Sequence, residues 1–374
     1  MDAAPLAFPL GQPPHQWLDG YSGRRVAITG AAGTVGRELV AQLLASRVAE
    51  IRLLDNAESA LFELETALDD VRVHCFVVDV QHCEQIERAL SGVDDLFHCA
   101  AYKHVPACER NPRAAIENNI NAVQNIITAS RSNGVERVLF TSSDKAVNPT
   151  NVMGTSKLMG ERLITAANAL DIDNRTVFAS TRFGNVLGSS GSVVPVFARQ
   201  IREGRPLTIT HRDMTRFVMT PADSALLVLR SLQLAKGGEV FITKMPVLRI
   251  TDLADRMQVR LLPDGLSTEH RIVGVRPGEK LFEELMTDEE LARAHETDDF
   301  IVVLPAFRNI YDRIDYSEFE RRAPPEHVYR SDKLPIIGAR EIDALLNEVL
   351  ADGTSDNSGR AHEAQLTANV RKTA

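Results

Sequence analysis

Short apolar segments alternate along the first half of the chain with longer segments in which apolar residues recur at helical spacing. The apolar segments are Arg25–Thr29, Ile51–Asp55, Val73–Asp79, Asp95–Cys99, Arg137–Ser142 and Thr176–Thr181. Helical spacing lies between them, for example over Gly36–Ser46 and Pro112–Asn133. Strands that alternate with helices predict βαβ units, and uniformly apolar strands predict a sheet covered on both faces. The pattern therefore predicts an α/β fold with a doubly wound parallel sheet.

The alternation becomes less regular after about residue 186. The elements expected there are a helix over Ser192–Glu203, a strand over Leu207–Thr210, a helix over Pro221–Ala235, a strand over Glu239–Thr243 and a helix from Thr251. They predict a smaller α+β lobe, with room for the chain to cross between the lobes more than once. We expect an N-terminal arm over 1–22, a first domain over 23–186, mainly the smaller lobe over 187–352 and a flexible tail over 353–374. Ligands of doubly wound folds bind at the carboxyl ends of the strands, where the two lobes would meet.

The composition excludes several classes of protein. The 374 residues are 44% hydrophobic and 25% charged, which is typical of globular domains and not of fibrous or disordered chains. A net charge of −9 argues against a nucleic acid or an anionic membrane as the main partner. No apolar run approaches the roughly 20 residues of a membrane helix, and the N-terminus lacks the basic segment of a signal peptide. We therefore expect a cytoplasmic protein.

The cysteines indicate neither a disulfide framework nor a metal site. There are 4 cysteines in 374 residues, which is too sparse for a disulfide scaffold and fits a reducing compartment. Cys75 and Cys83 each follow a histidine, but the chain has no C-x-x-C pair. We expect buried thiols and no metal.

A glycine-rich turn connects the first predicted strand to the first predicted helix. Gly30, Gly33 and Gly36 follow Thr29 in the spacing G-x-x-G-x-x-G. Glycine allows a tight turn, a close approach of backbone to a pyrophosphate and close packing of helix on strand. The N-terminus of the helix would then face the phosphates with free N–H groups. The motif predicts a dinucleotide site on a Rossmann-like sheet.

Acidic residues at two strand ends bear on the choice of dinucleotide. Asp55 ends the second strand, 19 residues beyond Gly36. A carboxylate there can bond the ribose hydroxyls of NAD and would repel the 2′-phosphate of NADP, so we expect NAD. The alternative is that Asp55 caps the following helix, and both roles can hold together. Asp79 and Val80 end the third strand, where they could flank the adenine or be an ordinary strand end.

A second group of polar residues follows the fifth predicted strand. Ser143, Asp144 and Lys145 stand at its carboxyl end, and Lys157 follows twelve residues after Lys145. This arrangement, together with the glycine turn, resembles the extended short-chain dehydrogenase/reductase superfamily. That superfamily normally has Tyr-x-x-x-Lys, with tyrosine as the base on a substrate hydroxyl. Here Met153 occupies the tyrosine position.

One branch of that superfamily is similar in more detail, namely the nucleotide-sugar 4,6-dehydratases that act on UDP-N-acetylglucosamine. The segments that resemble it are SSDKAVNPTNVMGTSK, AAYKHVP, RFGNVLGSSGSVVP, MTRF and RPGEKL, spread over about residues 24–285. The NPTNVMG segment looks closest to members that retain the configuration at C5. The GEVFITKMP segment looks closer to soluble inverting members, so both stereochemical outcomes stay open.

The resemblance implies an internal redox reaction. NAD would oxidise C4 of the sugar, water would leave across C5 and C6, and the hydride would return to C6. Asp144 is implied as the acid for the C6 oxygen, Lys145 as the base for C5, and Lys157 as the partner of the nicotinamide ribose. Free Asp and Lys carry the opposite protonation at neutral pH, so we expect desolvation and the positive nicotinamide to shift both pKa values. Without a tyrosine, Ser143 or a water it holds would relay the proton of the 4-hydroxyl group.

The remaining predicted site residues line the cofactor and the UDP-sugar. Further cofactor contacts are expected from Ala32, Thr34, Val35, Asn56, Ala100, Ala101, Tyr102 and Asn119. Sugar-nucleotide contacts are expected from Lys103, His104, Asn185, Val194, Arg216, Arg276 and Glu279. Within the second set, the resemblance implies that Arg216 and Arg276 clamp the diphosphate, since the guanidinium group meets phosphate oxygens in pairs.

Two alternative functions stay open. A nucleotide-sugar epimerase or 4-dehydrogenase could use the same scaffold, although it needs no acid–base pair for elimination. A non-catalytic NAD-binding sensor would explain the missing tyrosine but not the retained lysines and arginines. In either case we expect a homo-oligomer, formed through the helices predicted over 112–133 and 154–170.

Overall fold

The computed structural model describes residues 18–170, 176–263 and 265–352, and most of the expected N-terminal arm and the whole expected tail lie outside these ranges. A 9-stranded sheet forms the centre of the large domain, in the order β13-β14-β10-β6-β5-β4-β1-β2-β3. Its strands are β1 (Arg25–Thr29), β2 (Glu50–Asp55), β3 (Val73–Val77), β4 (Asp95–His98), β5 (Arg137–Ser143), β6 (Val177–Phe183), β10 (Val240–Thr243), β13 (Ala294–Glu296) and β14 (Phe300–Val303). Only β14 pairs antiparallel with its neighbours β10 and β13. The predicted α/β fold with a parallel-dominated, doubly wound sheet is confirmed.

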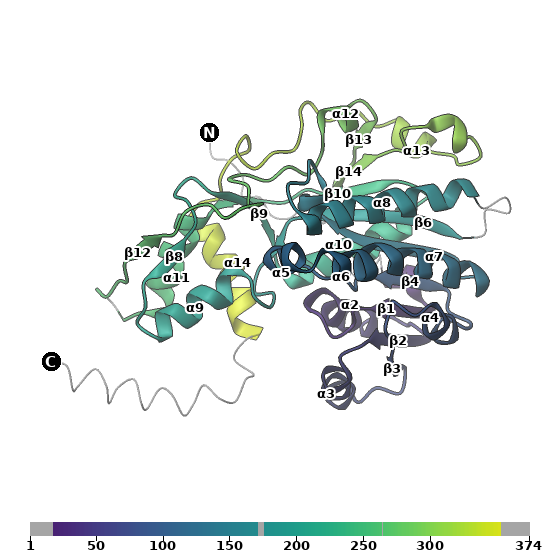
Figure 1. Cartoon of the computed structure of the whole chain (residues 1–374), viewed down its shortest axis with the longest axis horizontal. Coiled ribbons are helices and arrows are strands. Elements are labelled where there is room, and N and C mark those ends of the chain that lie inside the picture. The colour runs from purple at the N-terminus through teal and green to yellow at the C-terminus, as the bar shows by residue number, and fades with distance from the viewer. Residues whose placement is uncertain (1–17, 171–175, 264, 353–374) are drawn as a thin grey trace.

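Helices cover both faces of this sheet (Figure 1). They are α2 (Thr34–Leu44), α3 (Glu58–Leu68) and α10 (Pro221–Leu234) over one face, and α4 (Cys83–Ala89), α7 (Ala122–Ser132) and α8 (Val152–Leu170) over the other. Successive strand residues point to opposite faces, so Val26 and Ile28 pack under α2 and α10 while Ala27 packs under α4 and α7. Burial on both faces explains why central strands such as β1 and β4 are mostly apolar.

A smaller lobe stands beside the sheet, on the left in Figure 1. It contains a 3-stranded sheet of β7 (Asn185–Val186), β9 (Thr215–Met219) and β11 (Val247–Arg249), and a pair of β8 (Leu207–Ile209) with β12 (His270–Ile272). Its helices are α9 (Val193–Arg202), α11 (Ile250–Leu261) and α14 (Ala339–Asp352). Phe197, Leu253 and Leu346 contribute one side chain from each helix to a core that is separate from those of the large sheet.

The chain crosses between the lobes more than once. After entering the small lobe at β7, it returns to the large domain to form α10 and β10, and later β13 and β14. At the other end of the chain, Tyr21 is fully buried and donates a hydrogen bond from its hydroxyl to the carbonyl oxygen of Leu229 (2.5 Å). The segment after residue 17, which we grouped with the arm, thus packs onto α10. Leu18 and Tyr21 are both buried in this segment. In the sequence these two residues follow directly on a proline-rich stretch, so they were grouped with it.

The remaining elements are short. They are the helices α5 (Val105–Arg110), α6 (Pro112–Ile116), α12 (Asp288–Leu291) and α13 (Ser317–Glu320), the 3₁₀ helices Asp19–Tyr21, Asp144–Ala146 and Arg308–Ile310, and a π-helical turn over Glu117–Asn121. The single helix predicted over 112–133 is therefore α6 and α7 joined by the π-helical turn.

Three further observations concern the described residues. Cys75, Cys83, Cys99 and Cys108 are free thiols. Within the same ranges, no cluster of three or more His, Cys, Asp and Glu side chains could hold a metal ion. None of the helices in this part of the chain is both long enough and apolar enough to cross a membrane.

Candidate active site

The glycine turn between β1 and α2 is shaped by close backbone contacts. Gly30 has a φ of +68°, and a Cβ atom built on it would lie 2.7 Å from the backbone nitrogen of Ala100. A Cβ atom on Gly36 would lie 2.4 Å from the carbonyl oxygen of Gly30. Gly33 is the N-cap of α2 and has no side chain to cap it, so the first N–H groups of the helix remain available to an anion. These features fit the pyrophosphate of a dinucleotide.

Asp55 holds this turn in place. Its Oδ2 accepts a hydrogen bond from the backbone nitrogen of Ala32 and its Oδ1 one from that of Ala57, both at 3.0 Å. The carboxylate therefore joins the turn before α2 to the turn before α3. The N-cap of α3 is Ala57 and no side chain caps this helix, so the capping role considered for Asp55 is not seen. Ala32 contributes its backbone and is not among the residues that line the cavity described next. The carboxylate of Asp79 likewise accepts a hydrogen bond from the backbone nitrogen of Gln81 (2.9 Å).

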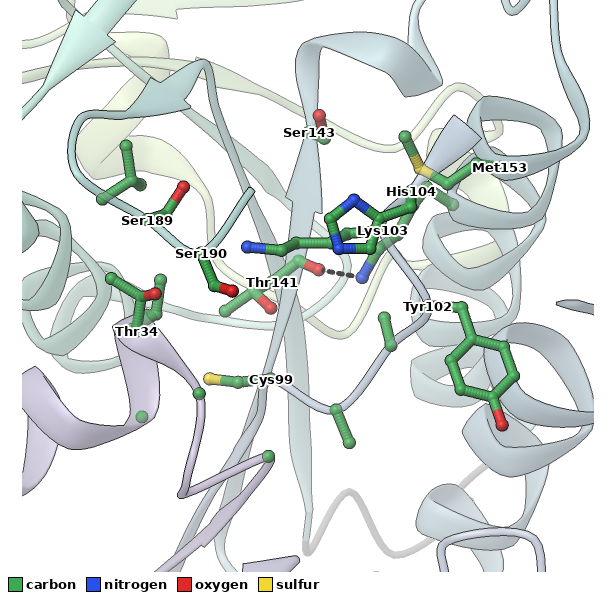
Figure 2. A pocket seen from close by; sticks show the side chains of 18 of the residues that line it. Thr34, Cys99, Tyr102, Lys103, His104, Thr141, Ser143, Met153, Ser189 and Ser190 are labelled. Carbon is green, nitrogen blue, oxygen red and sulfur yellow. Dashed lines mark hydrogen bonds between the residues drawn. The ribbon is translucent and has the colours of Figure 1, made fainter. Parts of the chain in front are cut away.

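A cavity of about 610 Å³ runs from the glycine turn along the carboxyl ends of the parallel strands to the small lobe. Predicted site residues that line it are Gly30, Gly33, Thr34, Val35, Gly36, Asp55, Asn56, Val80, Ala100, Ala101, Tyr102, Lys103, His104, Ser143, Lys145, Met153, Lys157 and Asn185. Figure 2 shows Lys103 and His104 in this cavity together with Ser143, Met153 and the small-lobe residues Ser189 and Ser190. The structure thus gathers most of the predicted cofactor and catalytic residues in one place.

Asp144 and Lys145 form a close pair at the end of β5. The ammonium nitrogen of Lys145 lies 3.1 Å from both carboxylate oxygens of Asp144, and the Ser143 hydroxyl donates to Asp144 Oδ1 at 2.5 Å. Burial raises the pKa of Asp144, but the charge of Lys145 and the hydrogen bonds outweigh it and lower that pKa. Burial lowers the pKa of Lys145, but the two acidic neighbours Asp144 and Glu283 outweigh it and raise that pKa.

These directions correct the expectation from desolvation alone. We expected burial to raise the pKa of Asp144 and lower that of Lys145. The mutual attraction of the two charges is the stronger effect at this distance. The free site therefore favours the ion pair, and elimination requires a proton to move within it.

Lys157 stands on α8 beside this pair. Its ammonium group donates to the carbonyl oxygen of Thr141 (2.8 Å, the dashed line in Figure 2) and lies 4.7 Å from the centre of the Phe140 ring. Burial lowers the pKa of Lys157 to about 8. Met153 lies one helical turn earlier, lines the cavity and packs on Cys108. A thioether cannot exchange a proton, so Met153 supplies shape and apolar surface only.

The side chain of Asn119 holds the loop after β4 in place through hydrogen bonds. Its Oδ1 accepts from the backbone nitrogen of Tyr102 (2.8 Å), and its Nδ2 donates to the carbonyl of Tyr102 (3.0 Å) and the hydroxyl of Ser156 (2.9 Å). Asn119 lies in the π-helical turn, and such turns often occur at functional sites. The side chain is buried and is not among those lining the cavity, so a direct cofactor contact stays a prediction.

A second cavity, of about 220 Å³, opens on the other side of Lys145. It brings together predicted residues from distant parts of the chain, namely Asp144, Lys145, Asn185, Arg216, Arg276 and Glu279. The guanidinium group of Arg216 donates to the carbonyl oxygens of Thr215 (2.7 Å) and Lys280 (2.9 Å). Its Nε lies 3.2 Å from Glu283. The diphosphate clamp stays a prediction, and for Arg216 it requires an exchange of these protein partners.

One predicted substrate residue, Val194, is placed differently from the others. Val194 is buried in the small-lobe core beside Phe197 and is not among the residues lining either cavity, so a contact with uracil stays a prediction. The Asn185 amide donates to both carboxylate oxygens of Glu283, at 3.0 and 2.8 Å. Glu283 itself was missed from the sequence. The sequence offered no local signal for it, because Glu283 lies in neither a helix nor a strand and its partners come from distant parts of the chain.

Comparison with known proteins assigns the chain to a family. The family model described as polysaccharide biosynthesis protein matches residues 26–305. A Methanocaldococcus jannaschii protein described as an uncharacterized membrane protein is 45% identical over 289 residues, 76% of this chain and 87% of its own. The UDP-glucose 4-epimerase of Rickettsia canadensis is 34% identical over 327 residues, 86% of this chain and 95% of its own. The X-ray structure of Pen from Bacillus thuringiensis superposes with a TM-score of 0.81 at 34% identity, covering 88% of this chain and 98% of its own.

The sheet, the glycine turn and the polar strand end place the chain in the extended short-chain dehydrogenase/reductase superfamily. Within it, the chain belongs to the polysaccharide biosynthesis protein family, whose relatives include nucleotide-sugar epimerases.

Proposed function

We propose that the protein dehydrates UDP-N-acetylglucosamine, with NAD as its cofactor, to the 4-keto-6-deoxy sugar nucleotide. The observation that carries this proposal is the pair of buried Asp144 and half-buried Lys145. Lys145 lines the cavity that also contains the glycine turn and Lys157, and both members of the pair line the second cavity. Elimination of water needs an acid and a base side by side, and hydride transfer alone does not. An adjacent carboxyl and amine at the end of β5 meet that need.

NAD, when bound, supplies a hydride acceptor for C4 and a hydride donor for C6. The uncapped N–H groups of α2 and the narrow glycine turn fit its pyrophosphate, and Asp55 stands at the end of β2 where a ribose would lie. Lys157 would hold the nicotinamide ribose, and its positive charge would favour loss of the proton from the 4-hydroxyl group of the sugar. Ser143, which already donates to Asp144, would relay that proton in the absence of a tyrosine.

In the elimination, Lys145 removes the proton from C5 and Asp144 protonates the C6 hydroxyl, which leaves as water. Ketone formation at C4 precedes this step because it acidifies the C5 hydrogen. We propose that configuration at C5 is retained, on the resemblance of the segment around Met153 to retaining members of the branch. The protein would act in the cytoplasm as a homo-oligomer.

A 4-epimerase is the second candidate, because relatives that match most of the chain are named UDP-glucose 4-epimerase. An epimerase needs removal and return of the C4 hydride but no acid at C6 and no base at C5. The Asp144–Lys145 pair would then have no chemical task, and this favours dehydration. Outside enzymes, an NAD-binding sensor would bind the cofactor without turnover.

The test is incubation of the purified protein with UDP-N-acetylglucosamine in D₂O, followed by proton NMR. Dehydration predicts a 6-deoxy-4-keto product with deuterium at C5, and the C5 configuration in the same spectrum distinguishes retention from inversion. A 4-epimer without deuterium at C5 would replace the proposal with an epimerase. Binding of NAD without any product from UDP sugars would favour the sensor.

A further inference from the structure

The side-chain amide of Asn185 is held in one orientation. Its Nδ2 lies 3.0 Å from the carbonyl oxygen of Phe217, and 3.0 and 2.8 Å from the two carboxyl oxygens of Glu283. A peptide carbonyl can only accept hydrogen bonds, so the end of the amide that faces it must be the NH₂ group. The amide oxygen, Oδ1, therefore points away from these partners.

The two residues that orient the amide are themselves fixed. Glu283 is 4% exposed, its backbone nitrogen donates to the hydroxyl of Ser331 (2.9 Å), and its carbonyl oxygen accepts from the backbone nitrogen of Ser331 (2.9 Å). Phe217 is fully buried on β9, which pairs with the strand that carries Asn185. Burial and the neighbouring Asp144 raise the pKa of Glu283 to about 7. The orientation of the amide does not depend on that titration, because the carbonyl of Phe217 accepts at every pH.

The other end of the amide is a hydrogen-bond acceptor that faces the site. In the part of the chain that the structure describes, no group donates to Oδ1 of Asn185, and this oxygen is not sealed off from solvent. Asn185 lines both cavities. A ligand atom that meets Oδ1 must therefore carry a proton to donate. The diphosphate of a nucleotide sugar offers only acceptor oxygens at neutral pH, so it does not match this group.

Glu283 also places Asn185 beside the proposed catalytic pair. Its Oε1 accepts from Asn185 and lies 3.5 Å from the ammonium nitrogen of Lys145, so a single oxygen atom contacts both side chains. The part of a substrate that reaches Asn185 is therefore next to the reacting carbons. On a nucleotide sugar, the donors in that region are the hydroxyl groups of the ring and the N–H of an acylamino group at C2.

We propose that Asn185 is a specificity-determining residue whose Oδ1 accepts a hydrogen bond from a hydroxyl or amide N–H group of the sugar, and that Glu283 is the positioning residue that orients it. That the ligand is a sugar nucleotide rests on the proposed function, while the orientation of the amide does not. Such a site discriminates against a sugar that lacks the donor, because Oδ1 is then left without a partner.

Asn185→Leu tests the assignment, because leucine has a similar size and no hydrogen-bonding group. The protein is loaded with NADH, which cannot accept a hydride, so that calorimetry at pH 8 measures binding without turnover. The affinity for UDP-N-acetylglucosamine should fall about tenfold, the effect of one hydrogen bond. The affinity for UDP, which has the diphosphate but no sugar, should stay the same and thereby show that the variant is folded. Asn185→Ser keeps a donor for Glu283 but is too short to reach the sugar, and it should show the same difference.

Asn133, at the end of α7, supplies the matched control. Its Nδ2 also donates to two oxygens of the protein, the carbonyls of Glu87 (3.1 Å) and Ala129 (2.9 Å), but Asn133 lines neither cavity. Asn133→Leu should leave both affinities unchanged. Equal weakening of UDP and UDP-N-acetylglucosamine by Asn185→Leu would overturn the proposal, because Asn185 would then bind the nucleotide. Unchanged binding of the sugar nucleotide would overturn it as well.

Two analogues identify the donor group. UDP-2-deoxyglucose lacks a donor at C2, and UDP-3-deoxyglucose lacks one at C3. The analogue without the bonded group should bind the wild type and Asn185→Leu equally, and a difference that persists with both analogues assigns the donor to the 4- or 6-hydroxyl group. If UDP-N-acetylglucosamine shows the expected loss of affinity but the wild type with NAD yields no dehydrated sugar, the proposed reaction fails while the assignment of Asn185 stands.

Discussion

Lys157 combines full burial with a positive charge. Its residue is 6% exposed, and its partners are a carbonyl oxygen and an aromatic ring, neither of which carries a formal negative charge. This arrangement costs stability in the protein without ligands, and it places a cation where a developing negative charge on the substrate would meet it.

The pKa of Lys157 gives a pH-dependent stability with a defined sign. Because folding lowers this pKa from 10.5 to about 8, the lysine destabilises the folded state wherever it is charged there, and the penalty disappears as pH rises through 8 towards 10.5. Lys157→Met should therefore be more stable than the wild type near pH 7, by up to about 3 kcal/mol, with the difference shrinking towards pH 10. Urea denaturation of both proteins across this range measures it.

The exposed Lys333 provides the control. Lys333→Met should change the free energy of unfolding by less than about 0.5 kcal/mol, since an exposed side chain stays in contact with water on folding. A Lys157→Met difference that grows with pH would contradict the assigned burial cost.

Individual site residues could be predicted to different extents. Ser143, Asp144 and Lys145 could be placed because parallel strands bring their carboxyl ends to one edge, so a polar cluster after an apolar run indicates a site. Glu283 could not be placed in this way, because its contacts are with Asn185 on β7 and Arg216 on β9, which are distant from it in the sequence. Which partners a carboxylate has is a property of packing between lobes, and no local pattern encodes it.

At the scale of elements, a buried ion cluster connects α8, β6 and α12. Arg182 on β6 is 1% exposed, and its guanidinium group makes paired hydrogen bonds to Glu161 on α8 and to Glu290 on α12, between 2.6 and 2.8 Å. Glu161 lies one turn beyond Lys157, and α12 follows the segment that holds Glu283. The cluster therefore fixes α8, which carries Lys157, relative to the segment that contains Glu283.

Replacing Arg182 by Met should lower the free energy of unfolding by roughly 3–5 kcal/mol, because it removes the paired cation of Glu161 and leaves the buried Glu290 with only the more distant Arg293, at 3.8 Å. Urea denaturation at pH 7 measures this change. The pH dependence has a sign as well: burial raises the pKa of Glu290, but Arg182 outweighs it and lowers that pKa to about 2. The pair therefore stabilises the wild type above pH 4.5, and this stability is lost as pH falls towards 2, a loss that the variant should lack.

A surface pair serves as the comparison for Arg182. Arg88 lies 3.8 Å from Glu84 on α4, and both side chains are at least 80% exposed. Arg88→Met should change the free energy of unfolding by less than about 0.5 kcal/mol. Equal effects of Arg182→Met and Arg88→Met would show that the buried cluster does not stabilise the packing of α8, β6 and α12.

The elements themselves followed closely from the sequence pattern. The predicted Arg25–Thr29 strand is β1, and the strand predicted over Arg137–Ser142 is one residue short of β5. The π-helical turn within the predicted 112–133 helix could not be expected from the sequence. Asn118 and Asn119 are polar residues in a segment with ordinary helical spacing, and only the structure shows that both are buried in a turn that is wider than that of an α-helix. The prediction allowed the chain to cross back to the large domain, but the pattern could not say that α10 and β10 are the elements that do so, because their apolar pattern is the same whichever sheet they join.

At the scale of the whole molecule, the predicted homo-oligomer can be tested on two exposed apolar side chains. Ile116 on α6 is 48% exposed and Met159 on α8 is 45% exposed, and both lie within the helical segments expected to form the interface. The double variant Ile116→Glu, Met159→Glu should reduce the mass measured by light scattering to that of a monomer, because an apolar contact would then bury unpaired charge of one sign.

Phe62→Arg on α3 supplies the control, because Phe62 is 64% exposed but lies outside those segments. It should leave the measured mass unchanged. A monomeric wild type would refute the predicted assembly, and an unaltered mass of the double variant would place the interface elsewhere.

The strand order of the large sheet has a consequence for how the protein is made. Strand β6 is paired on one side by β5 and on the other by β10, which the ribosome adds only after the first small-lobe segments. Until then the nascent chain presents an open strand edge of apolar residues, the kind of surface that captures other strands. Synthesis through β10 is required before this edge is closed, so premature termination anywhere between β6 and β10 would release a fragment prone to aggregation.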